Sequence, residues 1–342
     1  MQFTSVTNMA AWARDAGPAR IVADLVEALE VDFRRWPAFD LVPRLATHSS
    51  DGVIELMPAS DGEQYAFKYV NGHPENPQRG LQTVTAFGVL ADVYSGYPTF
   101  LAEMTLLTAL RTAATSALAA RWLAAPGCRT MAMIGAGSQA EFQALGMRSQ
   151  LGIDRLRVVD VDPRATAKLQ RNLTPLGFEV EVCATASAAV DGADVITTCT
   201  ADKANATVLH LGDVRPGVHV NAIGGDCPGK TELDPRILDA ATVVVVEHTP
   251  QTRIEGEIQQ KPADFPVTEL HEVIRGLRPG RTAAEQITVF DSVGFALEDF
   301  TALRFVRDAV RGTRYSETLD LLTDPEDPKD LFGILGAPAP VA

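Results

Sequence analysis

Asp226 stands in a sequence context suited to proton transfer. It follows Gly224 and Gly225 in the segment NAIGGDCPGKTEL, three residues after an apolar run ends at Ile223. Glycines at such a point let the backbone pass close to a bound ligand, and a carboxylate there can accept and return a proton. The same residues also permit a structural interpretation, in which Asp226 caps a helix that begins within PGKTELD. The local sequence leaves both interpretations open.

A second pattern, in the segment MAMIGAGSQAEFQALGM, is typical of a dinucleotide-binding turn. Gly135 allows the tight turn after a strand, Gly137 lets the backbone approach a pyrophosphate, and the small Ala140 lets the following helix pack closely. Asp160 ends the next apolar run twenty residues later, where a carboxylate can bind the adenosine ribose and repel a 2′-phosphate. The pattern predicts NAD rather than NADP. The alternative is a glycine turn in an unrelated βα unit, with Asp160 on the surface.

Three cations in the N-terminal part form another candidate site. Arg44 is one, Lys68 stands in the apolar and aromatic run YAFKYV, and Arg111 has Leu, Ala and Thr as neighbours. Charges in apolar surroundings need partners. A bound carboxylate would supply one, and an arginine can hold it with two hydrogen bonds. Internal salt bridges, for example to Glu55 or Glu103, are the alternative and are more common for any one of these cations taken singly.

The order of apolar runs predicts an α/β protein whose central part is a doubly wound parallel sheet. From about residue 130 to 250, short apolar runs alternate with helical stretches, which is typical of right-handed βαβ units. Ligands bind such sheets beyond the carboxyl ends of the strands. We therefore expect the strand ends at Thr200 and Ile223 to meet beside Gly135, with Asp226 nearby.

The flanking segments predict a second body that mixes helices and strands. Residues 40–95 contain β-rich runs separated by turn residues, as in an antiparallel sheet, and residues 104–124 have helical spacing without proline. We expect that helix to be buried and to link the two parts. Residues 287–310 predict a strand, a turn at Gly294 and a helix, and the Asp- and Pro-rich tail predicts a surface arm.

Composition narrows the classes of function. The chain has 342 residues, enough for two domains, and its 30 basic and 44 acidic side chains give a formal charge of −14, which disfavours nucleic acid and anionic membrane as partners. The cysteines lack metal-ligand spacing and the N-terminus lacks a signal-peptide pattern, so we expect a reduced, cytoplasmic protein without a structural metal. No G-x-S-x-G motif occurs, which disfavours nucleophilic hydrolysis.

A series of sequence blocks resembles the ornithine cyclodeaminase/μ-crystallin family over nearly the whole chain. The blocks include YAFKYVNGHP, TALRTAATS, IGAGSQAEFQAL, NAIGGDCPGKTEL, PQTRIEGEIQQ and FDSVGFALED. The resemblance implies a Rossmann-type NAD-binding domain at residues 113–299. It also implies an α+β substrate-binding and dimerisation domain, formed by residues 1–112 together with 300–342, and a homodimer.

The resemblance further implies a role for each site residue. Asp226 would bind the substrate and act as the acid and base of the reaction. A clamp for the substrate α-carboxylate would consist of Arg44, Lys68 and Arg111. Glu55 would face a distal amine of the substrate, and Val293 would line the pocket. The implied NAD contacts are Thr83, Arg111, Gly135, Gly137, Ser138, Gln139, Asp160, Thr200, Val220, Asn221, Ala222, Ile223, Lys230 and Ser292.

The activity implied by the resemblance is an ammonia-lyase reaction. L-Ornithine would lose ammonia and close to L-proline, with NAD recycled in each turnover. The family also contains lysine cyclodeaminases, NAD-dependent alanine dehydrogenases, ketimine reductases and non-catalytic NAD(P)-binding proteins like μ-crystallin. Glu55 and Asp226 argue against the dehydrogenase and reductase, and the cations together with Asp226 argue against a binding protein. The sequence does not decide between ornithine and lysine.

Overall fold

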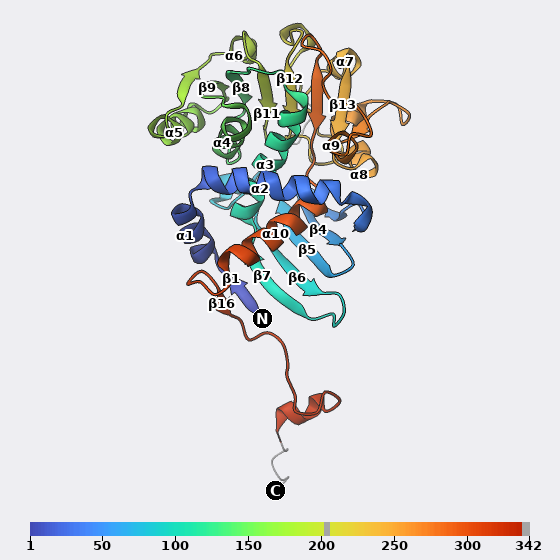
Figure 1. The fold of residues 1–342 in the computed structure, drawn as a ribbon. Coiled ribbons are helices and arrows are strands. Elements are labelled where there is room, and N and C mark those ends of the chain that lie inside the picture. Colours follow the sequence, from blue (N-terminus) through green and yellow to red (C-terminus); the bar gives the residue numbers. More distant parts are fainter. Residues whose placement is uncertain (202–205, 337–342) are drawn as a thin grey trace.

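Two eight-stranded sheets organise the described part of the chain, residues 1–201 and 206–336 of a computed structural model. In Figure 1 the two sheets lie one above the other, with helices packed between them. The lower sheet is built mainly from the N-terminal third of the chain, and the upper sheet from residues 130–291. No described helix combines the length and apolarity needed to cross a membrane.

The upper sheet is parallel throughout, as the alternation of apolar runs and helices predicts. Its strands run in the order β10-β9-β8-β11-β12-β15-β13-β14. The order reverses between β8 and β11, and the crevice at such a reversal is where doubly wound sheets bind ligands. The strands are β8 (Thr130–Ile134), β9 (Arg155–Val159), β10 (Glu179–Val182), β11 (Val195–Thr198), β12 (His219–Ala222), β13 (Val243–Val246), β14 (Thr268–Glu269) and β15 (Thr288–Asp291).

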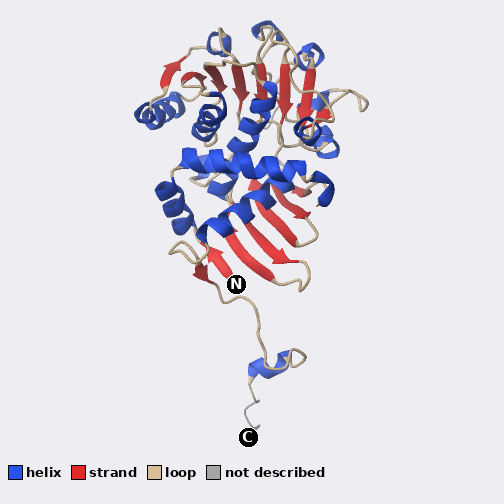
Figure 2. Cartoon of the chain, viewed as in Figure 1, coloured by secondary structure: helices blue, strands red, loops and turns tan. Residues whose placement is uncertain are grey.

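Short helices connect these strands (Figure 2). They are α4 (Ala140–Leu151), α5 (Pro163–Leu173), α6 (Ala186–Val190), α7 (Pro235–Ala240), α8 (Thr249–Glu255) and α9 (Leu270–Ile274). Several begin with a capping side chain, for example Asp162 on α5 and Asp234 on α7. An acidic or hydroxyl side chain there satisfies a backbone N–H that the helix leaves unpaired.

The lower sheet has the order β16-β1-β7-β6-β5-β4-β2, with β3 also paired to β4. All its pairs are antiparallel except β1 with β7, so the antiparallel expectation for residues 40–95 is confirmed. Its strands are β1 (Gln2–Thr4), β2 (Asp40–Leu41), β3 (Leu45–His48), β4 (Val53–Ser60), β5 (Gln64–Gly72), β6 (Ala86–Asp92), β7 (Pro98–Glu103) and β16 (Glu317–Thr318).

Helices cover one face of this sheet and together with it form the lower body. They also join it to the upper body, which is the parallel sheet with its helices. α10 (Ala296–Val310) packs on β4, β5 and β6, and α2 (Pro18–Arg34) packs on α10, α3 and α4, after α1 (Val6–Ala16). The long buried helix expected at residues 104–124 is α3 (Thr105–Leu123). After β16 the chain leaves the body as the expected surface arm, with a short exposed 3-10 helix at Leu331–Leu335 (Figure 1).

The domain division expected from the sequence, at 112/113 and 299/300, falls inside α3 and α10. Both are unbroken helices, so neither cut coincides with a loop. We propose to keep the division of the chain into two bodies, with α3 and α10 as the elements that join them. Residues 202–205 and 337–342 lie outside the described residues.

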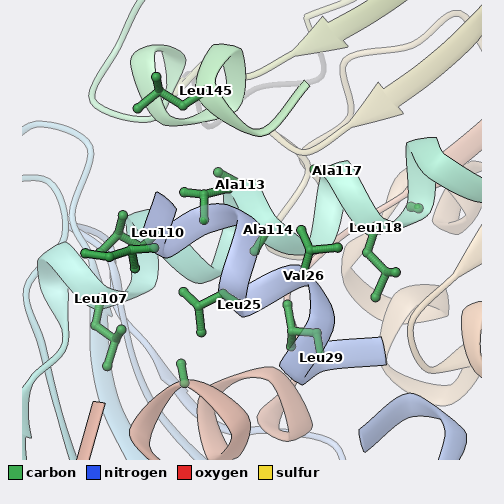
Figure 3. Close-up of a cluster of buried hydrophobic side chains, with 14 of the residues drawn as sticks. Leu25, Val26, Leu29, Leu107, Leu110, Ala113, Ala114, Ala117, Leu118 and Leu145 are labelled. Atoms are coloured by element: carbon green, nitrogen blue, oxygen red, sulfur yellow. The ribbon is translucent and has the colours of Figure 1, made fainter. Parts of the chain in front are cut away.

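Small residues allow helices α2, α3 and α4 to pack closely between the two bodies. Figure 3 shows Ala113, Ala114 and Ala117 of α3 between leucines from α2 and α4. Gly146 of α4 is the tightest point, because a Cβ added there would lie 2.7 Å from the carbonyl oxygen of Ala113. The orientation of the upper body on the lower one therefore depends on a glycine at this crossing.

We predict that Gly146→Ala lowers the melting temperature. Alanine gains about 1 kcal/mol over glycine from helix propensity, but overpacking against a backbone carbonyl costs about 1–3 kcal/mol. The measurement is thermal unfolding followed by circular dichroism. Gly212→Ala is the control, since a Cβ there has no neighbour within 4 Å. A Gly146→Ala protein as stable as wild type would contradict the packing argument.

Candidate active site at the carboxyl ends of the parallel strands

The glycine turn after β8 has the geometry that its sequence predicts. Gly135 has a φ of 99°, and a Cβ there would lie 2.8 Å from the carbonyl oxygen of Cys199, so only glycine fits without strain. A Cβ on Gly137 would meet no atom within 4 Å, which leaves its backbone open to a ligand. Ala140 is fully buried and begins α4. The turn can therefore present its backbone N–H groups to a phosphate.

Asp160 follows β9 and faces this turn. Its Oδ2 accepts a hydrogen bond of 2.6 Å from the N–H of Ala136, and its Oδ1 accepts one of 2.8 Å from the N–H of Asp162. The carboxylate is thus held at the end of the neighbouring strand, where a ribose would lie beside the turn. Gln139, one of the predicted cofactor residues, has a buried Oε1 without a hydrogen-bond partner. A bound polar ligand would give that atom a partner.

The ends of β11 and β12 are joined by a carboxylate that the sequence analysis did not select. Glu232 accepts hydrogen bonds from the N–H of Thr200 (2.7 Å) and, through its other oxygen, from the N–H of Gly224 (2.9 Å). The predicted residues Val220 to Ile223 therefore end beside Thr200, as expected. Next to them, Ser292 donates its N–H to the carbonyl of Ala222 at 2.9 Å.

Asp226 lies on the loop beyond β12, and the helix-cap interpretation is wrong. The described residues 227–234 contain no helix, and α7 starts at Pro235 with Asp234 as its cap. The side chain of Asp226 is 57% exposed and accepts a hydrogen bond of 3.2 Å from Nζ of the buried Lys230. Although burial works against the lysine charge, Asp226 raises the pKa of Lys230. The two predicted residues thus form an ion pair at the crevice.

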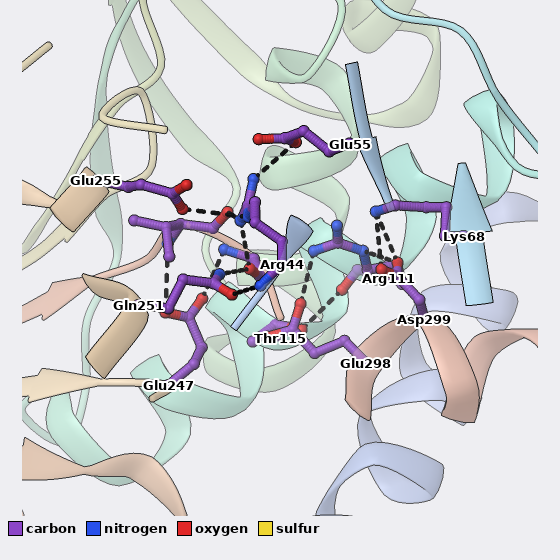
Figure 4. A network of polar contacts seen from close by, with 12 residues as sticks. Arg44, Glu55, Lys68, Arg111, Thr115, Glu247, Gln251, Glu255, Glu298 and Asp299 are labelled. Atoms are coloured by element: carbon purple, nitrogen blue, oxygen red, sulfur yellow. Dashed lines mark hydrogen bonds and ion pairs between the residues drawn. The ribbon is translucent and has the colours of Figure 1, made fainter. Parts of the chain in front are cut away.

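Lys68 and Arg111 are brought together by a shared acid. Oδ1 of Asp299 accepts hydrogen bonds of 2.9 Å from both Nζ of Lys68 and Nε of Arg111, and Glu298 accepts one of 2.6 Å from Nη1 of Arg111 (Figure 4). Burial, with the nearby Arg111 charge, lowers the pKa of Lys68 to about 8. Nη2 of Arg111 donates to no other described residue. It is available to a ligand.

The internal salt bridges foreseen for the cations exist, but one of the suggested partners is wrong. Glu103 binds no cation in the described chain; its Oε1 instead accepts the N–H of Leu106 at 3.0 Å. The partners of Lys68 and Arg111 come from the first turn of α10, far along the sequence. The suggested pair of Arg44 with Glu55 is present, at 3.0 Å.

Arg44 and Arg111 converge on Gly294. Nη2 of Arg44 donates to the carbonyl oxygens of Val293 (2.6 Å) and Gly294 (2.7 Å). The guanidinium of Arg111 packs against Gly294, where a Cβ would lie 2.8 Å from Nη1. Gly294 also has a φ of 75°, so it forms the turn expected there. The two clamp arginines therefore meet next to Val293, and Lys68 is joined to Arg111 through Asp299.

Two further residues that the sequence analysis missed hold this loop. The carboxylate of Glu247 is buried and accepts hydrogen bonds from the N–H groups of Val293 (3.2 Å) and Gly294 (3.1 Å) and from the hydroxyl of Ser292. Burial raises its pKa. Gln251 donates to the carbonyl of Gly294 at 2.8 Å. Because buried cations need acid partners, the sequence indicates that some acids of the segments PQTRIEGEIQQ and FDSVGFALED bind them. It does not indicate which acids.

Thr83 is the predicted residue that the structure leaves apart. It lies before β6, and its carbonyl accepts the N–H of His73 at 2.8 Å. No hydrogen bond or ion pair links it to the other predicted cofactor residues within the described ranges. Its role stays a prediction.

Electrostatics connect the two parts of the site. Burial lowers the pKa of Arg44, but the charges of Glu55 and Glu255 and, after them, that of Asp226 on the upper body raise it above its ordinary value. The charge of Asp226 acts also on Glu255. Asp226 of the upper body is therefore close enough to Arg44 and Glu255 for their charges to interact.

Comparison with known proteins reveals close relatives. An ornithine cyclodeaminase of Agrobacterium fabrum is 59% identical over 333 residues, which cover 97% of this chain and 94% of that protein. A lysine cyclodeaminase, whose structure concerns recognition of L-lysine, L-ornithine and L-2,4-diaminobutyric acid, has a TM-score of 0.84 at 33% identity, covering 91% of this chain and 92% of that one. An archaeal alanine dehydrogenase dimer with bound NAD has a TM-score of 0.82 at 30% identity, covering 91% and 96%.

The profile of the ornithine cyclodeaminase/mu-crystallin family matches residues 6–314. This stretch contains the glycine turn, Asp226 and all three buried cations. The structural relatives confirm the expected α/β fold, with a parallel Rossmann-type sheet and a second sheet domain. Sequence, fold and site agree: the chain belongs to the ornithine cyclodeaminase/mu-crystallin family.

Proposed function

We propose that this protein converts L-ornithine into L-proline and ammonia, with NAD as a cofactor recycled in each turnover. The observation that carries the proposal is the buried cluster of Arg44, Lys68 and Arg111 with its acids, together with the charge of Asp226 acting on Arg44 from the edge of the parallel sheet. An acid beside a carboxylate clamp can handle the protons of an α-amino acid. Relatives about 60% identical over 97% of the chain are ornithine cyclodeaminases, which supports the assignment.

The glycine turn and its neighbours would hold NAD. The open backbone at Gly137 suits the pyrophosphate, Asp160 the adenosine ribose, and the orphaned Oε1 of Gln139 a polar group of the cofactor. Between the glycine turn and Asp226, the cofactor would contact Thr200, the end of β12, Lys230 and Ser292. When bound, NAD supplies a hydride acceptor at Cα of the substrate.

The clamp would bind the substrate α-carboxylate. The free Nη2 of Arg111 and the ammonium of Lys68 are held side by side by Asp299, so no large movement is needed to receive an anion. Preorganised donors of this kind lower the entropy cost of placing the reacting carbon. Val293 stands where the two arginines converge and would face the substrate chain.

Asp226 would accept and return the protons of the substrate amine. Its exposure leaves one side of the carboxylate open to a ligand, while Lys230 holds the other at 3.2 Å. Oxidation at Cα requires a neutral α-amine, and a carboxylate within reach can take its proton. The Lys230 ion pair holds the Asp226 side chain in place for that step.

A buried distal acid favours a diamino acid over alanine. Glu55 is only 5% exposed, and its Oε1 has no hydrogen-bond partner. A substrate with an apolar side chain would leave this one oxygen without a partner, although Oε2 binds Arg44, whereas a second ammonium would give Oε1 a donor. The site therefore supports the cyclodeaminase reaction better than the alanine dehydrogenase reaction.

We further propose that the protein is a homodimer joined through the uncovered face of the lower sheet. That face carries apolar side chains that no helix of residues 1–201 or 206–336 covers, with the Tyr69 and Phe87 rings stacked at a centroid distance of 5.1 Å. Its exposed members are Leu45, Ile54, Leu56, Tyr65 and Phe87. A contiguous apolar patch of this kind marks an interface, and a related structure is a dimer. Location in the cytoplasm remains a prediction of the sequence.

The first test is turnover with little cofactor. We expect the purified protein, given L-ornithine and sub-stoichiometric NAD, to form proline and ammonium in equal amounts and in large excess over NAD. Chromatography of proline and an ammonium assay give both quantities. Accumulation of NADH in step with ammonium would instead show an amino-acid dehydrogenase, and no product at all would show a binding protein.

Asp226→Asn should abolish most turnover without unfolding the protein. Loss of a general acid–base group costs about 10²–10⁴-fold in rate, and the exposed side chain carries little of the fold. The measurements are kcat for proline formation and NAD affinity, which should be retained. Asp264→Asn, at an exposed position, is the matched control. Near wild-type kcat in Asp226→Asn would remove the assignment.

Ile54→Lys should convert the dimer into monomers. The lysine would place a charge on the uncovered apolar face of β4, and burying it in an interface without a partner is costly. Light scattering coupled to size exclusion measures the mass. Leu277→Lys, at an exposed apolar position of the upper body, is the control and should leave the mass unchanged. A monomeric wild type, or a dimeric Ile54→Lys, would refute this interface.

A further inference from the structure

Glu255 lies beside the substrate clamp, although the sequence analysis did not select it. It is the last residue of α8, is 4% exposed, and places Oε2 at 3.1 Å from Nε of Arg44. Glu55 contacts Nη1 of the same guanidinium at 3.0 Å. Figure 4 shows the two acids on either side of Arg44. One buried cation therefore stands between two buried carboxylates.

Neither acid is fully satisfied by this arrangement. The ion pair of Glu255 with Arg44 lacks hydrogen-bond geometry, so neither Oε2 of Glu255 nor Nε of Arg44 forms a hydrogen bond, and Oε1 of Glu55 has no hydrogen-bond partner either. Nη2 of Arg44 donates both of its hydrogens to the carbonyl oxygens of Val293 and Gly294. Buried carboxylate oxygens without partners are costly. The pocket is therefore built for an additional donor.

The chemistry of the two unsatisfied atoms indicates that this donor is a cation. Both Oε1 of Glu55 and Oε2 of Glu255 are carboxylate oxygens beside Arg44. Hydrogen bonds from an ammonium to such an oxygen are charge-assisted and stronger than those from a neutral donor. L-Ornithine carries a second ammonium that could reach them, whereas alanine does not.

A site next to Arg44 is suitable for the distal nitrogen, because the substrate must fold back on itself for the ring to close. Ring closure joins the distal nitrogen to Cα, and Cα carries the carboxylate. Both ends of the substrate must therefore lie side by side during the reaction. Acids that flank one member of the carboxylate clamp are placed where the distal nitrogen has to be.

We propose that Glu255 binds the distal ammonium of the substrate and takes up its proton before ring closure, with Glu55 as the second ligand. The inference rests on the proposed function. The N–H bond of the ammonium breaks, an O–H bond forms on Glu255, and the electron pair stays on nitrogen. That pair then forms the bond to Cα of the imine, while the electrons of the C=N bond move to the α-nitrogen. A proton passes from the ring nitrogen to the α-nitrogen, which leaves as ammonia with the electrons of its bond to Cα. The electron pair on the ring nitrogen then forms the new C=N bond.

The protonation behaviour of Glu255 supports this role. Burial raises the pKa of Glu255 to about 7, Arg44 opposes this, and the charges of Glu55 and Asp226 add to it. A group with such a pKa exchanges a proton readily near neutral pH. The carboxylate form must accept the proton, so kcat/KM for ornithine should rise as pH increases through about 7.

Glu255→Gln should remove the preference for a distal ammonium. The probes are L-ornithine and L-norvaline, which has the same chain length but no distal amine, bound to the NADH-loaded protein in calorimetry. We expect ornithine affinity to fall about 10- to 100-fold, the range for a charge-assisted hydrogen bond, and norvaline affinity to stay unchanged. The rise of kcat/KM near pH 7 should also disappear. Glu255→Asp should restore part of both effects.

The outcomes separate this inference from the proposed function. Wild-type proline formation tests the function, independently of the variant. Given that activity, unchanged ornithine affinity in Glu255→Gln would overturn the inference. Equal loss for ornithine and norvaline would also overturn it, since Glu255 would then only hold Arg44. A lost preference with an unchanged pH profile would refute proton uptake by Glu255. Glu326→Gln, in the exposed arm, controls for the loss of one charge.

Discussion

The loop from Ser292 to Gly294 is held from both sides, and the arrangement of the site depends on it. Glu247 accepts the N–H groups of Val293 and Gly294, while Arg44 donates to their carbonyl oxygens. Ser292 donates its own N–H to the end of β12. Buried backbone groups must be paired, so this loop cannot shift without breaking several bonds at once. It therefore fixes the distance between the parallel sheet and the cation cluster.

Shared acids keep the cations in place before any ligand arrives. Asp299 binds both Lys68 and Arg111, which would otherwise repel each other in a buried setting. Desolvation makes such clusters expensive, and the pKa of Lys68 is lowered and that of Glu298 raised to about 8 by burial. A cluster of this cost contributes little to stability. Its benefit is a ready-made site, in which Nη2 of Arg111 is left for an anion and oxygens of Glu55 and Glu255 are left for an ammonium.

Much of the fold and of the cofactor site follows from local sequence. The glycine turn, the acid after the next strand and the helix α3 are each specified by residues within a short segment, and each was predicted within a few residues of its observed bounds. The partners of the cations could not be predicted in the same way. Glu298 and Asp299 are separated from Arg111 by almost 190 residues, and Glu103, which is near in sequence, points elsewhere.

The sequence by itself determined the class of chemistry, because a glycine turn with a downstream acid needs only its own strand, turn and helix to form. It also placed Asp226 beyond a strand end, since apolar runs end where strands do. Only the tertiary structure decided which acids surround Arg44 and that Glu255 is one of them. That choice arises from the packing of α8 and β4 about one guanidinium, and contacts between distant segments leave no periodic pattern in the sequence.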